Sequence, residues 1–204
     1  DTSIVMLEKW IKEGLLETAD GKDLALNKPT TDIALGTVRR GKPDGPPPMP
    51  EKPLPLDPLV VTSKGNAVIG LAASPWAPLL AVGGQKQIVL YNTDTMEYLG
   101  VIPFPDGFPT VLKFSRNGGF LLAGGGRGGK NGSATLFNIK TGQKVLTVGQ
   151  ESDAVLAADI SPDQTQIALG GPSKVVRVYS TVDGKLLHEI KKHTDWITSI
   201  EYSP

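Results

Sequence analysis

Residues 161–180 read SPDQTQIALGGPSKVVRVYS. A Ser-Pro pair precedes an apolar run, a glycine pair ends that run, and an alternating stretch of β-branched and polar residues follows. Short apolar runs bounded by Gly, Pro and Asp are typical of β-strands. The stretch therefore predicts two antiparallel strands joined by a short connection.

The same arrangement recurs along the chain. Ser115 and Ser161 follow Ser74 by 41 and 87 residues, and Ser203 comes 42 residues after Ser161. Glycine pairs end the apolar runs at 83–84, 124–125 and 170–171, and a small acidic or amide residue stands eight or nine places before each serine, at Asn66, Asp106, Asp153 and Asp195. A period of about 40–45 residues with four short strands per unit is typical of a propeller blade.

We therefore expect an all-β fold, a partial propeller of three four-stranded blades plus the first strand of a fourth. The blades span about 59–103, 104–149 and 150–191, and residues 192–204 open the next unit with a strand at 196–202. The expected strands are 67–72, 78–82, 87–91, 97–102, 110–114, 120–123, 134–138, 144–148, 154–160, 165–169, 175–180 and 185–190.

Two segments precede the blades. Residues 1–16 carry Ile4, Leu7, Ile11 and Leu15 at steps of three and four, which predicts a short amphipathic helix. Residues 17–58 form a linker, in which 43–58 hold eight of the seventeen prolines. Because proline fixes φ and removes the amide donor, we expect an extended, semi-rigid connector there.

The amino-acid composition limits the classes of partner and site that this chain can have. The 204 residues carry 21 basic and 21 acidic side chains, so no charge excess favours nucleic acid or an anionic membrane. The chain has no cysteine, which excludes disulfides and thiolate metal sites within it. It also has no apolar run of 18 residues or more, so we expect no membrane-spanning segment.

The repeats resemble those of WD-repeat proteins. HTDWITSIEYSP (193–204) is similar to that family's opening strand, and SPDQTQIALGG (161–171) to its second. Tyr91-Asn92, Phe137-Asn138 and Tyr179-Ser180 stand where the family has Trp-Asp. The family's His–Ser–Asp–Trp hydrogen-bond network therefore cannot form in these blades, and we expect other contacts to hold their turns.

A narrower resemblance covers most of the chain. IVMLEKWIKEG (4–14), the proline-rich linker and LAASPWAPLLAVGGQKQIVLYNTDT (71–95) resemble planctomycete-type bacterial proteins that join a c-type cytochrome domain to a WD-repeat propeller. The resemblance implies that 1–16 end the cytochrome domain, that c-type haem lies upstream with no cofactor in this chain, and that the location is periplasmic or otherwise extracytoplasmic.

The stretch GGGRGGKNG (124–132) raises a nucleotide-binding alternative. Gly124, Gly129 and Lys130 have the spacing of a phosphate-binding loop. That loop also requires Ser or Thr after the lysine and a helix behind it, whereas Asn131 follows Lys130 and the next predicted element is a strand. We expect a flexible, exposed hairpin loop with a four- to five-residue insertion.

No catalytic, cofactor-binding or metal-binding residues stand out. We expect Asp106, Asp153 and Asp195 to cap turns, and Trp196 to pack in the core or between blades. We expect the partner-binding residues to lie in loops at one end of the blades, since binding side chains collect on loops held by a rigid scaffold. The candidates are Asp106, Phe108, Arg127, Lys130, Glu151, Asp153, Lys174 and Asp195.

Two functions remain open. One is a non-enzymatic interaction scaffold that binds a protein or peptide. The other is the propeller component of a haem-dependent redox or electron-transfer assembly. Because three blades and one strand cannot close a ring, we expect further blades from the same or another chain.

Overall fold

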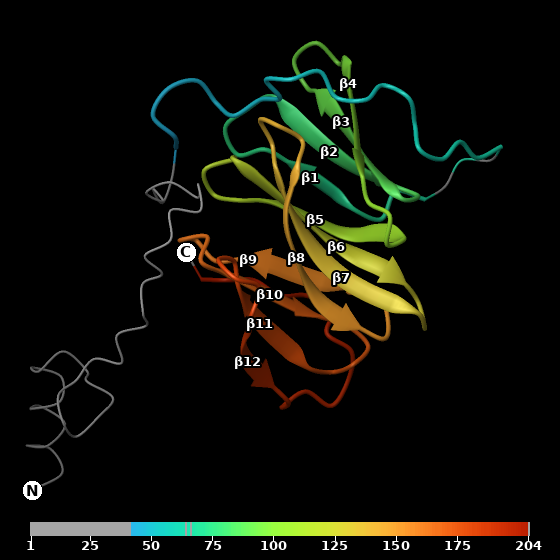
Figure 1. Cartoon of the computed structure of the whole chain (residues 1–204), viewed down its shortest axis with the longest axis vertical. Coiled ribbons are helices and arrows are strands. Elements are labelled where there is room, and N and C mark those ends of the chain that lie inside the picture. Colours follow the sequence, from blue (N-terminus) through green and yellow to red (C-terminus); the bar gives the residue numbers. More distant parts are fainter. Residues whose placement is uncertain (1–41, 64, 66, 204) are drawn as a thin grey trace, which may run out of the picture. The chain divides into compact units, whose positions relative to one another are not determined.

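The computed structural model describes residues 42–63, 65 and 67–203. Twelve strands form three four-stranded antiparallel sheets in these residues, with no helix among them, so the predicted all-β class is confirmed (Figure 1). None of the described residues forms a helix that could cross a membrane. The helix predicted at 1–16 lies outside the described residues.

Each sheet is one blade, and its strands lie in chain order. The first blade contains β1 (Leu71–Ala73), β2 (Leu79–Gly84), β3 (Gln87–Asn92) and β4 (Tyr98–Pro103). The second contains β5 (Phe108–Phe114), β6 (Phe120–Arg127), β7 (Asn131–Asn138) and β8 (Lys144–Glu151). The third contains β9 (Ala157–Ile160), β10 (Gln166–Gly170), β11 (Val176–Ser180) and β12 (Leu186–Ile190). All twelve strands predicted within the blades overlap an observed strand.

The serines of the repeat hold the turn between the first and second strand. Ser161 Oγ accepts from the Gln166 amide at 2.9 Å and donates to Asp163 Oδ1 at 2.6 Å. Ser115 Oγ likewise accepts from the Phe120 amide at 3.0 Å. A side chain that bonds the backbone a few residues on replaces a missing ladder bond, which explains why the serine recurs.

The residue that replaces the aspartate of Trp-Asp caps the turn between the third and fourth strand. Asn92 Oδ1 accepts from the amide of Asp94 at 2.9 Å, and Asn138 Oδ1 accepts from that of Lys140 at 2.9 Å. Ser180 Oγ accepts from the Val182 amide at 3.2 Å. The expectation that other contacts hold these turns is confirmed.

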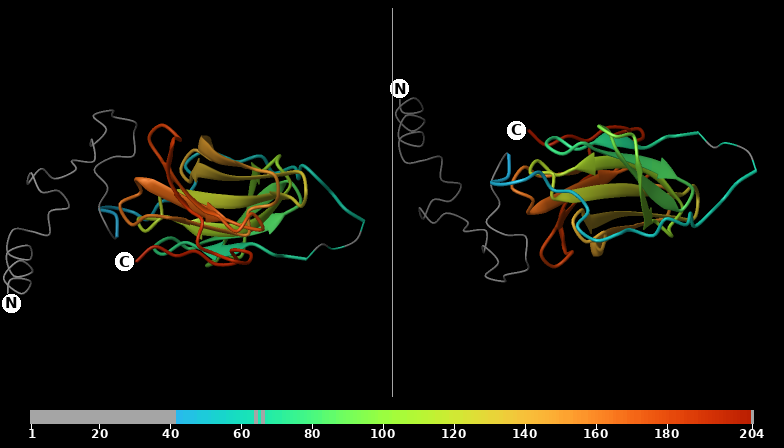
Figure 2. Two further views of the ribbon diagram at one scale, coloured as in Figure 1. Left: turned by 90° about the horizontal axis from the view of Figure 1, so that it is seen from below. Right: turned by 90° about the horizontal axis from the view of Figure 1, so that it is seen from above.

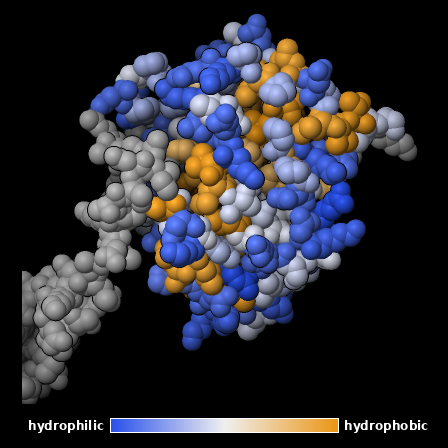
Figure 3. Space-filling view, in the orientation of Figure 1, coloured by the Kyte–Doolittle hydropathy of each residue, from blue (hydrophilic) through white to orange (hydrophobic). Residues whose placement is uncertain are grey.

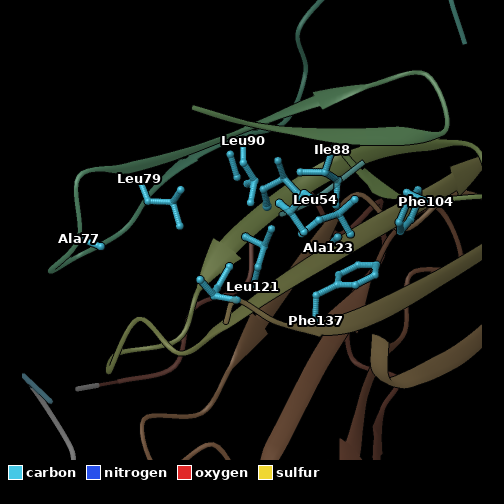
Figure 4. Close-up of a cluster of buried hydrophobic side chains, with 13 residues drawn as sticks. Leu54, Ala77, Leu79, Ile88, Leu90, Phe104, Leu121, Ala123 and Phe137 are labelled. Carbon is cyan, nitrogen blue, oxygen red and sulfur yellow. The ribbon is translucent and has the colours of Figure 1, made fainter. Parts of the chain in front are cut away.

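Neighbouring blades pack face to face through apolar side chains (Figure 4). One cluster joins blade 1 to blade 2, and it includes Leu79, Ile88, Leu90, Leu121, Ala123 and Phe137. A second joins blade 2 to blade 3, and it includes Leu122, Leu136, Ile167 and Leu169. Full burial of one such side chain stabilises the fold by about 1.5–3 kcal/mol, so these two clusters hold neighbouring blades together.

The strand predicted at 196–202 does not form. Ile197 is 5% exposed and packs on β9, β10 and β11, and its amide donates to Gly171 O at 3.0 Å. Among the described residues, however, this segment has no neighbouring strand with which to build a ladder. Trp196, expected to pack, is instead 60% exposed.

The second half of the proline-rich segment packs on the blades. We call residues 48–60 the strap; Figure 2 shows it (blue to teal) passing along the outside of the sheets. Leu54 is 7% exposed and belongs to the cluster between blades 1 and 2. The sequence predicts a connector there and contains no periodicity that indicates this docking.

Candidate functional site at the loop end of the blades

One end of the blades gathers two kinds of loop. In an antiparallel sheet the second and fourth strands end on the same side, so each turn between the second and third strand lies beside a blade-to-blade connection. We call this end the loop face. It contains 85–86, 104–107, 128–130, 152–156, 171–175 and 191–196.

Hydrogen bonds tie these loops together in pairs. The Lys86 amide donates to Gly107 O at 2.7 Å, and the Gly129 amide donates to Asp153 Oδ1 at 3.0 Å. In blade 3, Lys174 Nζ donates to Thr194 O at 3.0 Å. Each hairpin turn thus bonds the connection that follows its blade, which makes the loop face a rigid platform.

The glycine-rich stretch forms the predicted hairpin connection with an exposed tip, but the predicted loop is too long because most of the stretch belongs to strands. Gly124, Gly125 and Gly126 are buried residues of β6, and Gly132 belongs to β7. Only 128–130 form the turn, because β6 and β7 pair as far as Arg127 and Asn131. The extra residues lengthen two strands instead of adding a loose insertion.

Close packing explains the glycines. A Cβ on Gly125 would overlap the Phe108 carbonyl oxygen, and one on Gly132 would overlap that of Asp153. A Cβ on Gly124 would stand 2.7 Å from Val111 Cγ1. The amides of this stretch serve sheet pairing, and a strand follows it, so it cannot cradle phosphates as a loop before a helix does.

The three predicted turn aspartates differ in role. Asp153 Oδ1 accepts from the Ala154 amide at 2.7 Å, and Asp195 Oδ1 accepts from the Trp196 amide at 2.8 Å. Asp106 instead accepts from the Ser133 hydroxyl at 2.9 Å. All three carboxylates lie on the loop face, and each is a hydrogen-bond acceptor within the chain.

Glu151 lies at the edge of this face and is engaged inside the protein. Its side chain is 9% exposed, and Arg177 Nη1 donates to its two oxygens at 2.5 and 2.6 Å. Burial and the Glu151 charge also raise the pKa of Tyr179 beside it. A partner therefore does not reach this carboxylate directly. Sequence reasoning missed Arg177, whose partners become neighbours only when two blades pack.

The exposed cations among the candidates are Arg127, Lys130 and Lys174. Arg127 and Lys130 flank the β6–β7 turn, and Lys174 stands at the corresponding turn of blade 3. Phe108 is half-buried where β5 begins. The loop face therefore presents basic tips above hydrogen-bonded acidic residues.

A second polar site lies at the opposite end, among the first strands of the blades. A cavity of about 380 Å³ is lined by β1, β5 and β9 together with Glu201 and Tyr202. Lys113 Nζ is 3.6 Å from Asp159 Oδ1 and 3.3 Å from Glu201 Oε1. Burial, then the charges of Asp159 and Asp163, raises the pKa of Tyr202 to about 12. The alternation of apolar and polar residues along the strands did not predict that Lys113, Asp159, Glu201 and Tyr202 lie together.

The described part of the chain contains no group of three or more His, Cys, Asp or Glu side chains arranged to hold a metal ion. Among the charged side chains, Lys113 and Arg177 pair with carboxylates, and Lys174 bonds a backbone carbonyl.

No family model matches the sequence. A search of curated proteins found a similarity to the "DENN domain and WD repeat-containing protein SCD1" of Arabidopsis thaliana, 31% identical over 70 residues. The match covers 34% of this chain and 6% of that protein. Together with the three sheets, this similarity supports a WD-repeat-like propeller and, in general terms, a protein-interaction scaffold.

Proposed function

We propose that this chain is a non-enzymatic interaction scaffold whose loop face binds a protein or peptide. The observation that carries the proposal is the repeated tie between hairpin turns and blade connections, which holds Lys86, Gly129 and Lys174 in fixed loops. A rigid platform loses little conformational entropy on binding.

Charge supports a protein partner over nucleic acid. The exposed tips Arg127, Lys130 and Lys174 stand near Asp153 and Asp195, so the face carries both signs. A nucleic-acid surface needs a basic excess to neutralise several phosphates. A partner with interspersed acidic and basic side chains fits this pattern.

Charge reversal at the loop face tests the proposal. The variant Arg127→Glu and Lys130→Glu, which leaves the Lys174–Thr194 hydrogen bond intact, is compared with a matched variant that has the same charge change at exposed positions of the opposite end. That control carries Lys144→Glu and Lys185→Glu.

Both variants, immobilised, are offered extracts of the natural source, and retained proteins are quantified by mass spectrometry. We expect at least one partner to be lost from the loop-face variant and kept by the control. Identical retained sets would reject the loop face as the binding surface.

A second surface supports further blades as partners. Leu80 in blade 1, Leu121 in blade 2 and Ile167 in blade 3 are equivalent residues of the repeat. Leu121 and Ile167 are fully buried because each faces the preceding blade. On that face of blade 1, Leu71 is 60% exposed and Tyr91 36%. We propose that another blade covers it. Leu71→Asn is then expected to leave the stability of this chain unchanged and to weaken the larger assembly. Equal losses of stability in the isolated chain and in the assembly would contradict the proposal.

We also propose that the propeller follows a c-type cytochrome domain in an extracytoplasmic protein, which would make a redox or electron-transfer role the alternative function. The resemblance of residues 4–14 and of the proline-rich linker supports this. The test is an absorbance spectrum of the natural full-length protein, in which a missing Soret band would remove the proposal.

A further inference from the structure

The strap is bound as a peptide ligand is bound, at separate points along its length. The Glu51 amide donates to Lys140 O at 2.9 Å, and Pro55 O accepts from the Val101 amide of β4 at 2.8 Å. At the far end, Gln87 Oε1 accepts from the Leu59 amide at 2.7 Å. These bonds join an extended segment to both blade 1 and blade 2.

Between these bonds, Leu54 fills a notch lined by two glycines. A Cβ on Gly100 would stand 2.6 Å from Leu54 Cβ, and one on Gly142 would overlap Leu54 Cδ2. Leu54 lies among Ile88 and Phe137 of the core (Figure 4). Both glycines have positive φ, +134° and +68°, so a larger residue is disfavoured at each for backbone reasons as well.

The repeat shows why the notch exists. Gly100 pairs with Leu90 in blade 1, and Leu146 pairs with Leu136 at the corresponding place in blade 2. Gly100 and Leu146 thus occupy equivalent positions on the outermost strand. Blade 1 lacks the aliphatic side chain that blade 2 has there.

Leu54 occupies the space of that missing side chain. In blade 2, Leu146 Cδ1 would lie 3.3 Å from a Cβ on Gly184, the glycine of the next blade's last turn. Gly142 in the last turn of blade 2 is equivalent to Gly184 in the last turn of blade 3, and its neighbour is Leu54. In blade 1 the strap therefore provides the leucine side chain that blade 2 provides from its own outermost strand.

We propose that this notch is a binding site for extended Pro-Leu-Pro-Leu segments of other proteins, and that the strap occupies it as an intramolecular ligand. The site recognises one leucine side chain and the carbonyl of the following proline. Pro53 and Pro55 have no amide donor that binding could leave unpaired, and their fixed φ lowers the entropy lost on binding. The proposal is independent of the loop face.

The connection behind the strap allows exchange. The described residues of 61–69 are all exposed, and Figure 2 shows the teal parts of this connection lying away from the sheets. The strap can therefore leave without unpairing a strand. Next to it, Leu56 and Leu59 are 63% and 54% exposed, and Figure 3 shows hydrophobic side chains gathered over the strap and β4.

Tethering sets the conditions of the test. A tethered ligand competes at an effective concentration of about millimolar, so a free peptide binds the wild-type chain poorly. We use the 204-residue chain with Leu54→Ser, which removes the leucine of the strap and keeps the notch. The probe is a labelled synthetic peptide of residues 47–61, PPMPEKPLPLDPLVV.

We expect the Leu54→Ser chain to bind this peptide roughly tenfold or more tightly than the wild-type chain does, measured by fluorescence anisotropy. The peptide also raises the melting temperature of the variant, because a ligand of the folded state stabilises it. A peptide with Leu54→Ser does not bind, and one with Lys52→Ser, at an exposed position, binds normally.

Absence of binding and of thermal rescue would overturn the proposal, even for a partly unfolded variant, since a true ligand would restore it. Equal binding of the Leu54→Ser and unmodified peptides would do the same. A wild-type dimer that exchanges its straps would assign the notch to a second copy and overturn the assignment to other proteins.

Discussion

Arg177 on β11 and Glu151 on β8 form an ion pair that ties blade 3 to blade 2. Arg177 Nη1 donates to both carboxylate oxygens, and its Nε donates to Glu189 Oε1 at 2.9 Å. Burial by itself lowers the pKa of Arg177, but the hydrogen bonds to Glu189 and Glu151 outweigh it and raise the pKa. One cation thus bridges two acidic residues from neighbouring blades.

Glu151→Gln should destabilise the chain by about 1–2 kcal/mol, because a mostly buried charge-assisted pair is lost and Arg177 stays partly buried. Urea unfolding measures the change. Glu189→Gln is the control, with a smaller expected loss, since Glu189 is more exposed. Equal losses for the two variants would contradict the bridging role of Glu151.

Gly125→Ala should destabilise the chain by about 2 kcal/mol or more, because its Cβ would overlap the Phe108 carbonyl oxygen. Gly128→Ala, at the hairpin tip, has its nearest neighbour at 3.6 Å and should change stability by less than about 0.5 kcal/mol. Chemical denaturation of both variants gives the free energy of unfolding for a change in the strand and for a change in the turn. Similar values would restore the flexible-loop interpretation of this stretch.

Asp153→Ala should free the β6–β7 turn, because the Gly129 and Ala154 amides lose their acceptor. We expect trypsin to cleave after Arg127 and Lys130 on the order of ten times faster, which corresponds to about 1.4 kcal/mol of local opening. Asp195→Ala, which frees a different loop, is the control. Unchanged cleavage at Lys130 would show that Asp153 does not hold the turn.

Asp163 should make stability depend on pH in the acid range. Burial raises the pKa of its carboxyl, but hydrogen bonds from Ser161 and Thr165 outweigh burial and lower it. The folded state then binds the proton less readily than the unfolded state. The contribution is fully present above the ordinary aspartate pKa of about 3.9 and is lost as the pH falls through the lower folded value.

Asp163→Asn is expected to reduce the stability difference between pH 6 and strongly acidic solution, measured by thermal unfolding across that range. Asp57→Asn, at an exposed position of the strap, serves as the comparison. If both variants kept the wild-type slope, the Ser161–Asp163 contact would contribute nothing measurable.

The fold was largely predictable because it rests on local signals that repeat. Ser161, the glycine pairs and the alternating strands report turn and strand geometry within a few residues of each position. The extended hairpin at 124–132 was missed because glycine is as typical of loops as of closely packed strands. The sequence does not distinguish these two uses of Gly125.

The predicted surface residues share one end of the blades, but their contacts were not predictable. From the sequence, Glu151 is expected to be an exposed acidic residue. Only the packing of blade 3 on blade 2 places Arg177 beside it. Leu54 likewise reads as part of a connector until Gly100, distant in the chain, provides a notch. Both relationships depend on packing between units, which spacing within one unit does not record.

The Leu54–Gly100 relationship has an evolutionary consequence. A mutation that returned an aliphatic side chain to position 100 would remove the space for residue 54, and loss of the leucine at 54 would leave position 100 under-packed. The two positions should therefore change together in descendants of this sequence, although they lie in regions that an alignment of repeats would treat as unrelated.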